Sequence, residues 1–305
     1  MLDETKTSVQ TRCPACQSEA IQDLFAVPDH EYNLEYQAQY ARCWECSSFF
    51  QSPMPDLNQL SRFYPATYHS FDTNSMLGKL KHRQRLRRLR SFIDSDAITL
   101  LDYGSGSGAF IKESARHMPH GTFYGYEINS TDRKEMLAEG HVILLKGSFD
   151  YLLDELPLCD AITLNHVIEH LPNPLEVLSK LRQKLKPHGV MEGQTPAADS
   201  LEQSIFKKRW SGFHAPRHTV IFSKQGLTRL LKRADFSEIR ITPAFNPAGI
   251  AISLASLPQG NSGGYIARKG FSWLLCVALA TFFYPVDLLS GAPGIINFCA
   301  RKGMR

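Results

Sequence analysis

The sequence lacks three features that would each indicate a particular class of protein. Its first residues, MLDETKTSVQTR, have no apolar stretch, so we expect no secretory signal and a reducing, cytoplasmic environment. The charge-free run from Phe271 to Val286 has 16 residues, fewer than the roughly 18 to 20 that a membrane-spanning helix needs. The 34 Lys+Arg against 30 Asp+Glu leave a net charge of +4, which does not by itself indicate a nucleic-acid-binding protein.

Cysteine is scarce, but four of the seven cysteines form two close pairs. Cys13 with Cys16, and Cys43 with Cys46, have Cys-x-x-Cys spacing, and 26 residues separate the two pairs. Four thiolates in two such knuckles fit a tetrahedral zinc ion with no position open to water. We therefore predict a structural zinc site in a small N-terminal module, rather than a redox pair.

At about 150 residues per domain, the 305 residues predict two domains. The expected parts are a zinc-binding module at 1–65, a linker with a basic amphipathic helix at 66–95, and a larger domain at 96–305 with an apolar insertion at 244–290. In the linker, leucine and isoleucine recur at helical spacing over 76–93, and seven Lys/Arg lie between Lys79 and Arg90. We expect the basic helix to form either a phosphate-binding surface or a solvated helix face.

From residue 97 onward, short apolar runs alternate with helical patterns, which is typical of a parallel sheet with crossover helices. The expected strands lie at 98–103, 122–127, 142–145, 160–165, 189–194, 237–242 and 295–300. The expected helices lie at 108–117, 130–139, 174–186 and 224–234. The larger domain is therefore predicted to be an α/β fold.

The first of these strands leads directly into Gly104-Ser-Gly-Ser-Gly108 and then a helix. Glycines let a ligand approach the backbone, and the first N–H groups of the helix are free to donate to it. Glu127 ends the next strand, where its carboxylate can accept hydrogen bonds from both hydroxyls of a ribose. The spacing predicts a nucleotide-cofactor site.

Further motifs follow in the order typical of one enzyme family. Asp102 precedes the glycine loop, Asn165-His-Val-Ile-Glu-His170 follows the fourth strand, and Leu185-Lys-Pro-His-Gly189 lies further along the chain. Together with Glu127, these motifs resemble class I S-adenosylmethionine-dependent methyltransferases over about residues 75–305. The resemblance implies a Rossmann-like, seven-stranded, mostly parallel sheet with helices on both faces, beside a small zinc-ribbon-like module.

The resemblance also implies which residues bind S-adenosylmethionine. The implied cofactor-binding residues are Asp102, Gly104, Ser105, Gly106, Gly108, Glu127, Ile128, Ser148, Phe149, Asn165 and His166. The segment from Asp102 to Gly108 would hold the methionine part, Glu127 the ribose, and Ser148 with Phe149 the adenine. The family often has an acidic residue where Ser148 stands, which weakens the assignment of that contact.

Methyl transfer is an in-line displacement, so the protein aligns the acceptor and, for a hydroxyl, removes its proton. Histidine suits this proton because its unperturbed pKa is about 6.5. The segment after the fourth strand and the loop at 210–218 are expected to meet over the cofactor. The candidate catalytic residues are His166, His218, His170 and His214, with His166 and His218 as the favoured pair. His170 and His218 can instead brace the loops through backbone hydrogen bonds.

A catalytic divalent metal is an alternative use of the same residues. Some methyltransferases present Glu-x-x-Glu-His and a later histidine to a divalent cation, and here the pattern reads His166-x-x-Glu169-His170, with His218 as the fourth ligand. The imidazole at the first position departs from that pattern, because Mg²⁺ prefers oxygen ligands.

The cysteine module ahead of such a core resembles that of bacterial enzymes that methylate sugars and other natural products. It implies a small-molecule or lipid-linked acceptor, with a sugar hydroxyl as the leading candidate and C-methylation of a nucleotide sugar as an alternative. A nicotinamide-dependent oxidoreductase and a non-catalytic zinc-module adaptor are further alternatives. Nucleic acid is not expected, because only Lys207-Lys-Arg-Trp210 adds a basic patch with an aromatic residue.

Two segments remain open between a functional and a packing role. The run 271–286 can lie in the lipid headgroup plane at the inner face of a membrane, anchored by Trp273 and Tyr284 and aided by the basic helix at 79–90, or it can be a buried helix. Tyr64 and Tyr68 either cap the cofactor or pack.

Overall fold

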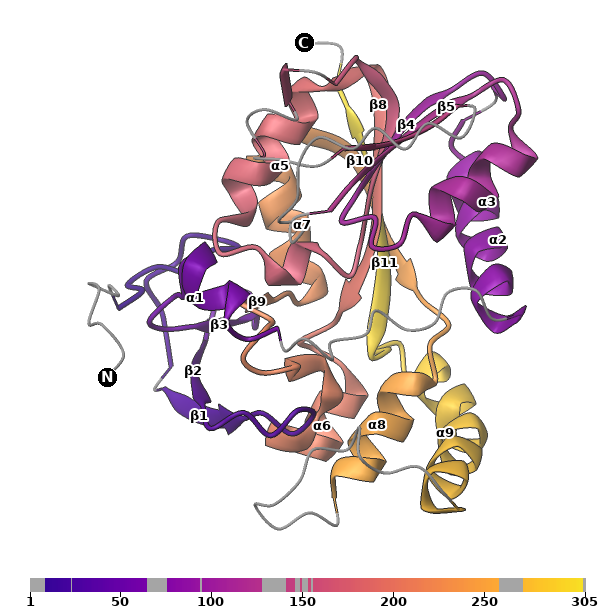
Figure 1. The fold of residues 1–305 in the computed structure, drawn as a ribbon. Coiled ribbons are helices and arrows are strands. Elements are labelled where there is room, and N and C mark those ends of the chain that lie inside the picture. The colour runs from indigo at the N-terminus through magenta and orange to yellow at the C-terminus, as the bar shows by residue number, and fades with distance from the viewer. Residues whose placement is uncertain are drawn as a thin grey trace.

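The computed structural model of the protein describes residues 9–22, 24–64, 76–93, 95–127, 141–145, 149, 153–154, 156–257 and 271–303. A seven-stranded sheet lies at the centre of the molecule, with a four-stranded sheet beside it and two helices, α8 and α9, at the opposite end from the C-terminus (Figure 1). The expected helix at 130–139 lies outside the described residues.

All seven predicted strands of the central sheet are present. They are β4 (Thr99–Tyr103), β5 (Thr122–Tyr126), β6 (Val142–Leu145), β7 (Cys159–Asn165), β8 (Leu185–Pro196), β10 (Phe236–Pro243) and β11 (Ile295–Lys302). Strand β8 begins at Leu185, four residues earlier than expected and within the last part of the predicted helix 174–186. Their order is β10-β11-β8-β7-β4-β5-β6, and β11 runs antiparallel to both of its neighbours while the other pairs are parallel. The predicted mostly parallel α/β sheet is confirmed.

Helices cover both faces of this sheet (Figure 1). They are α2 (Met76–Arg90) and α3 (Ala109–His117) on one face, and α5 (Pro174–Gln183) and α7 (Lys224–Arg233) on the other. On the first face, Leu86 and Leu89 of α2 join Leu100 and Phe123 of the sheet in one buried cluster. This burial of apolar side chains holds the helices to the sheet.

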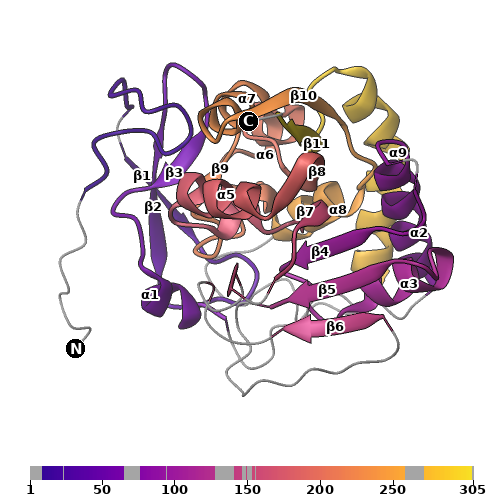
Figure 2. The same cartoon turned by 90° about the horizontal axis from the view of Figure 1, so that it is seen from above.

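The N-terminal module shares its sheet with the larger domain. Its strands are β1 (Phe25–Pro28), β2 (Gln37–Arg42) and β3 (Phe49–Gln51), followed by the short helix α1 (Leu57–Ser61). The fourth strand, β9 (Val220–Ile221), comes from the far end of the chain and pairs with β3. Seen from above, the arrowheads of β4, β5 and β6 point towards this module (Figure 2). The carboxyl edge of the central sheet therefore faces the module.

Four arginines of the basic helix α2 pair with acidic residues of the larger domain. The pairs are Arg83–Glu113, Arg85–Asp102, Arg88–Glu192 and Arg90–Asp96. The side chains of Arg85 and Arg88 are only 13% and 22% exposed, and their partners are buried. The sequence predicted a phosphate-binding or solvated face for the whole helix, and this is wrong for Arg85 and Arg88, which face inward.

The apolar insertion forms two helices that pack on each other, α8 (Ala248–Ser256) and α9 (Phe271–Leu289). The preceding chain forms α6 (Leu201–Phe206) and the short turn η2 (Lys207–Arg209). Tyr284 is buried, and its hydroxyl donates to the carbonyl oxygen of Ala244 at 2.6 Å, so its expected role as an interfacial anchor is wrong.

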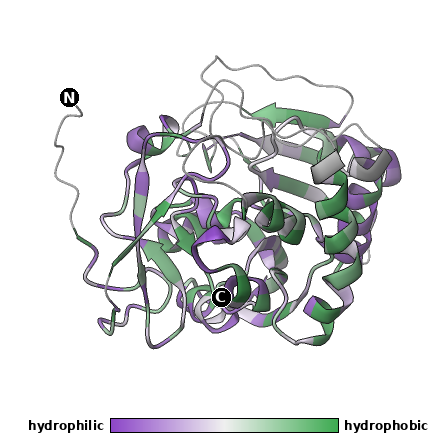
Figure 3. Cartoon of the chain, turned by 90° about the horizontal axis from the view of Figure 1, so that it is seen from below, coloured by the Kyte–Doolittle hydropathy of each residue, from purple (hydrophilic) through white to green (hydrophobic). Residues whose placement is uncertain are grey.

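One face of α9 is nevertheless apolar and exposed. Leu274, Phe282 and Leu289 are 65%, 76% and 88% exposed, and the helix is green along most of its length in Figure 3. Among the described residues, no helix has both the length and the hydropathy needed to cross a membrane.

Candidate active site

The glycine loop follows β4 in a conformation that requires glycine. Gly104, Gly106 and Gly108 have φ angles of +80°, +54° and +73°, a region that L side chains rarely adopt. A Cβ atom on Gly104 would also lie 2.4 Å from Cγ2 of Val167. Gly108 immediately precedes α3, so the first N–H groups of that helix are directed towards the loop.

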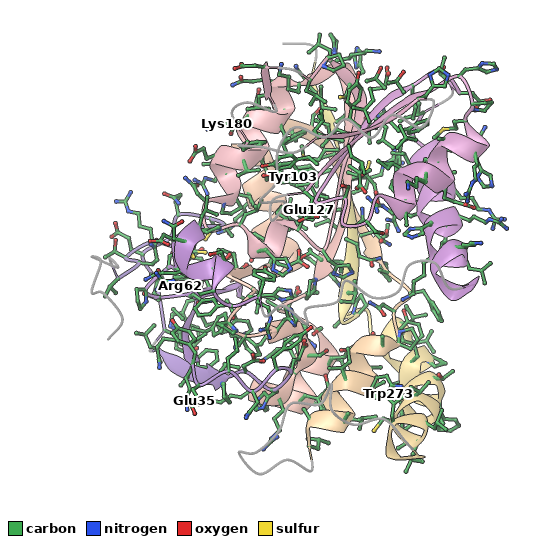
Figure 4. The ribbon with its side chains drawn as sticks, in the orientation of Figure 1. Glu35, Arg62, Tyr103, Glu127, Lys180 and Trp273 are labelled. Atoms are coloured by element: carbon green, nitrogen blue, oxygen red, sulfur yellow. The ribbon has the colours of Figure 1, made fainter. Side chains whose placement is uncertain are left out.

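Glu127 directly follows β5 and is hydrogen-bonded to the glycine loop. Its Oε2 atom accepts a hydrogen bond from the backbone N–H of Gly106 at 2.7 Å. Phe149 lies nearby, with its ring centroid 5.2 Å from that of Tyr103. Figure 4 shows Tyr103 and Glu127 close together in the centre of the molecule. The structure thus brings the loop, Glu127 and Phe149 to one place, while Ile128, Ser148 and Tyr68 lie outside the described residues.

Asp102 of β4 and Asn165 of the neighbouring strand β7 both accept hydrogen bonds from the guanidinium group of Arg85. The carboxylate of Asp102 accepts from Oγ1 of Thr163 at 2.7 Å and from Nη2 of Arg85 at 2.5 Å. With the amide of Asn165 turned so that its oxygen accepts, the same arginine donates from Nε at 2.7 Å and from Nη2 at 2.6 Å. Arg85 was not among the predicted site residues, because its sequence neighbours are equally basic and nothing local distinguishes it.

Four histidines converge beyond the ends of β7 and β8. His166 and His170 come from the segment around the turn η1 (Ile168–His170), and His214 and His218 from the loop after the turn η3 (Ser211–Phe213). The ring centroid of His218 lies 4.5 Å from that of His170 and 5.0 Å from that of His214. The two segments therefore lie together, as the order of motifs led us to expect.

Two of these rings are neutral. Nδ1 of His218 lies 2.8 Å from the carbonyl oxygen of Gly212, which can only accept, so Nδ1 carries the proton and Nε2 the lone pair. Nδ1 of His170 lies 2.9 Å from the hydroxyl of Tyr64 and 3.1 Å from the carbonyl oxygen of Arg217. Burial lowers the pKa of His170 to about 4, and burial with the neighbouring His170 and His214 holds the pKa of His218 well below 6.5.

The other two histidines are hydrogen-bonded at both ring nitrogens. His214 faces Glu31 through Nδ1 at 2.7 Å and accepts from Nε of Arg217 at 2.9 Å. Nδ1 of His166 lies 3.2 Å from Oε1 of Glu169, and its Nε2 lies 3.0 Å from Oε1 of Gln194. Because each of these two rings is bound on both sides, both are suited to hold their neighbours in place.

Glu169 lies buried between the two histidine groups. Oε2 accepts from Oγ1 of Thr195 at 3.0 Å, and Oε1 lies 3.9 Å from Nε2 of His218. Burial raises its pKa, but the hydrogen bond from His166 and the surrounding imidazoles outweigh this, so the net shift is downward. Ligand atoms of Glu169, His170 and His218 all lie within 4.8 Å of one another, a set that can hold a metal ion.

The N-terminal module holds the loop that carries His214 and His218. The hydroxyl of Tyr40 and the amide of Gln51 donate to the carbonyl oxygen of His218 at 2.6 and 2.8 Å. Arg217 forms a bidentate ion pair with Asp29, at 2.9 and 3.1 Å, and neither side chain is exposed. Sequence reasoning missed these contacts because the partners lie far apart in the chain and follow no periodic pattern.

The four paired cysteines also come together. Sγ of Cys13 lies 3.7 Å from that of Cys46, and Sγ of Cys16 lies 3.5 Å from that of Cys43. A tetrahedral ion with Zn–S bonds of about 2.3 Å needs sulfur atoms roughly 3.8 Å apart, so the cluster has suitable dimensions. Helix α7 packs against it, and Arg233 donates to the carbonyl oxygens of residues 14 and 15 at 3.0 Å.

A comparison with family models matches residues 77–240 to a methyltransferase domain family. A curated relative, the malonyl-(acyl-carrier protein) O-methyltransferase of Halalkalibacterium halodurans, is 25% identical over 155 residues, which are 48% of this chain and 57% of that protein. The chain thus spans little more than half the length of this relative.

The fold is similar to that of solved methyltransferases. Phosphoethanolamine N-methyltransferase 2 of Haemonchus contortus, in complex with S-adenosylmethionine, has a TM-score of 0.51 and 14% identity, over 93% of this chain and 68% of that chain. A methyltransferase of Archaeoglobus fulgidus dependent on the same cofactor has a TM-score of 0.46 and 20% identity, over 72% of this chain and 94% of that chain.

Glu127→Gln tests the cofactor half of the site. Because a carboxylate accepts from ribose hydroxyls more strongly than an amide, we expect S-adenosylhomocysteine to bind at least about tenfold more weakly, measured by calorimetry. Glu176→Gln, which changes an exposed glutamate of α5, serves as the control and is expected to bind like the wild type. Equal affinities for all three proteins would contradict this placement of the ribose.

Proposed function

The chain belongs to the methyltransferase domain family, and on this premise we propose that it transfers the methyl group of S-adenosylmethionine to a hydroxyl oxygen of a small-molecule or lipid-linked acceptor. A sugar hydroxyl is the acceptor we favour. The cofactor's methionine part would lie against Asp102 and the glycine loop, its ribose against Glu127 and its adenine against Phe149. Family membership argues against both the nicotinamide-dependent oxidoreductase and the non-catalytic adaptor.

The observation that carries the proposal is the neutral ring of His218. Its Nδ1 proton is fixed by the carbonyl oxygen of Gly212, and its Nε2 lies 3.9 Å from Oε1 of Glu169, a residue that follows the carboxyl end of β7, the edge where open α/β sheets bind ligands. In the proposed mechanism, the acceptor oxygen attacks the sulfonium methyl in line while Nε2 of His218 takes the hydroxyl proton. The nearby carboxylate of Glu169 stabilises the imidazolium that forms.

A general base is needed by some methyl acceptors and not by others. A neutral amine already presents its lone pair, whereas a hydroxyl has to lose a proton during the reaction. The name of the curated relative, an O-methyltransferase, agrees with an oxygen acceptor. C-methylation of a nucleotide sugar also requires loss of a proton, from carbon, and remains the second candidate.

The exposed apolar face of α9 favours a lipid-linked acceptor over a freely diffusing one. The free energy falls when exposed apolar side chains such as Leu274, Phe282 and Leu289 are removed from water. A helix of this kind, parallel to the membrane surface, would bring the site to a lipid-linked glycan. Tyr284 does not contribute, because it is buried.

The acceptor class can be identified from a strain that lacks the gene. We expect its lipid extract to contain a glycan species lighter than the wild-type one by one methylene group, and the purified enzyme with S-adenosylmethionine to restore that mass in vitro. Fragmentation would place the missing group on a sugar oxygen. A mass difference located on carbon would favour the C-methyltransferase alternative, and one located on nitrogen would contradict the proposal.

The pH dependence of kcat tests the role of His218. A base must be neutral to accept a proton, and the pKa of His218 lies below 6.5, so kcat should stay constant from about pH 8 down to pH 6.5 and fall only below it. His218→Asn should lower kcat by about 100-fold or more without weakening cofactor binding. His188→Asn, at an exposed position with a φ of +62° that asparagine tolerates, is the control.

Wild-type kcat in the His218→Asn variant would contradict this role. Measuring kcat with and without added divalent metal tests the alternative site at Glu169, His170 and His218. A metal bound there would occupy the lone pair on Nε2 of His218 that a base needs. Activity that required added Mg²⁺ or Mn²⁺ would favour the metal alternative over the base.

We also propose that Cys13, Cys16, Cys43 and Cys46 hold a structural zinc ion. Four cysteine ligands leave no open position, so the ion would take no part in the chemistry. Its effect would be to fix the knuckles against α7 and, through the module's sheet, the loop that carries His218.

Metal analysis of the purified protein tests this site. We expect about one zinc per chain, lost in Cys43→Ser together with a lower thermal midpoint, because zinc binding contributes directly to folding. Cys276→Ser, a cysteine of α9 far from the cluster in sequence, should keep both the zinc and the midpoint. A full zinc content in Cys43→Ser would show that this cluster does not hold the ion.

A further inference from the structure

The carbonyl oxygen that fixes the proton of His218 belongs to Gly212, and an aromatic ring holds that glycine in place. The oxygen lies 2.8 Å from Nδ1 of His218. Gly212 packs so closely on Trp210 that a Cβ atom at this position would lie 2.2 Å from Cζ2 of the indole ring. At that distance a side chain on residue 212 would displace the ring or the backbone. The position of the carbonyl oxygen therefore depends on the position of the ring.

A hydrogen bond to helix α6 fixes the orientation of this ring. Trp210 is only 2% exposed, and its Nε1–H donates to Oε2 of Glu202 at 3.2 Å. A buried indole N–H that lacks an acceptor is costly, so the ring has to direct this edge towards the carboxylate. Glu202 thus determines which way the indole faces.

Glu202 occupies a site that is unfavourable for a carboxylate. It is buried, and its Oε1 atom makes no hydrogen bond to the residues that the structure describes. Gly294 contacts two acids here, since its N–H donates to Asp287 of α9 at 3.1 Å and a Cβ atom on it would lie 2.1 Å from Oε1 of Glu202. Burial and the neighbouring Asp287 raise the pKa of Glu202 to about 7. The acid is therefore not placed there for its charge, which points to its hydrogen bond with Trp210.

We propose that Glu202 is a positioning residue for the base of the proposed reaction, a role that rests on the proposed function of His218. It orients the ring of Trp210, and the ring in turn supports the carbonyl oxygen of Gly212. That oxygen keeps the proton of His218 on Nδ1 and leaves the lone pair on Nε2, where the acceptor's hydroxyl proton is taken.

The carboxylate of Glu169 makes this support necessary. Oε1 of Glu169 lies 3.9 Å from Nε2 of His218 and attracts a proton on that nitrogen. If the carbonyl oxygen of Gly212 moved away, the tautomer with its proton on Nε2 would become more populated. This tautomer has no lone pair on Nε2, so it cannot act as the base. Glu202 therefore acts on the base indirectly, through its tautomer.

NMR of the histidine ring nitrogens tests this role without a methyl acceptor. In the wild type at about pH 8 we expect the proton of His218 on Nδ1 alone. Glu202→Leu removes the acceptor of the indole N–H, so both tautomers should be present and kcat should fall at least about tenfold. Binding of S-adenosylhomocysteine should stay within about twofold of the wild type, which also shows that the variant is folded.

Two further variants separate the hydrogen bond from the charge. Glu202→Gln keeps an oxygen that accepts from the indole N–H and removes a charge that burial disfavours, so it should retain the single tautomer and the wild-type kcat. Trp210→Phe keeps a ring but lacks the N–H, and should show both tautomers. Glu176→Leu, at an exposed site of α5, and Trp44→Phe, at an exposed tryptophan, are the matched controls and should behave like the wild type.

Two results would overturn the proposal. A single tautomer of His218 and wild-type kcat in Glu202→Leu would mean that Gly212 is held without the indole hydrogen bond. A loss in Glu202→Leu that persists in Glu202→Gln would mean that the charge acts, and not the hydrogen bond. Failure of the proposed function is a separate result, because wild-type kcat in His218→Asn would contradict the base and leave the tautomer measurement valid.

Discussion

The buried ion pair between Asp29 and Arg217 joins the two halves of the molecule. Neither side chain is exposed, and a buried charge without its partner costs several kcal/mol, so each half requires the other. The pair is supported by β9, which completes the sheet of the N-terminal module, and by the hydrogen bonds from Tyr40 and Gln51 to the carbonyl oxygen of His218. The module therefore holds the loop on which the proposed base, His218, lies.

This arrangement divides the work of the site between two parts of the chain. The central sheet provides the glycine loop, Asp102 and Glu127 from adjacent strand ends, the half of the site that we propose receives the cofactor. In the proposed mechanism the loop around His218 receives the acceptor, and this loop is hydrogen-bonded to the module.

Local sequence patterns were enough to predict the central sheet and the positions of the glycine loop and Glu127. Strand periodicity and glycine at positive φ are set by neighbouring residues, so they can be identified in the sequence. The ion pair of Arg217, the contacts of Arg85 and the burial of Tyr284 depend on partners far away in the chain. The charge pattern of the basic helix does not distinguish Arg85 and Arg88, which face inward, from its exposed basic residues.

Amide hydrogen exchange in Asp29→Asn tests most directly whether the module fixes the loop that carries His218. This variant keeps the shape of the side chain and removes its charge, which leaves Arg217 without an ionic partner. We predict faster exchange at residues 214–221, and protection of β4 and β5 equal to that of the wild type. Unchanged exchange at 214–221, or a uniform loss of protection throughout the sheet, would contradict this account.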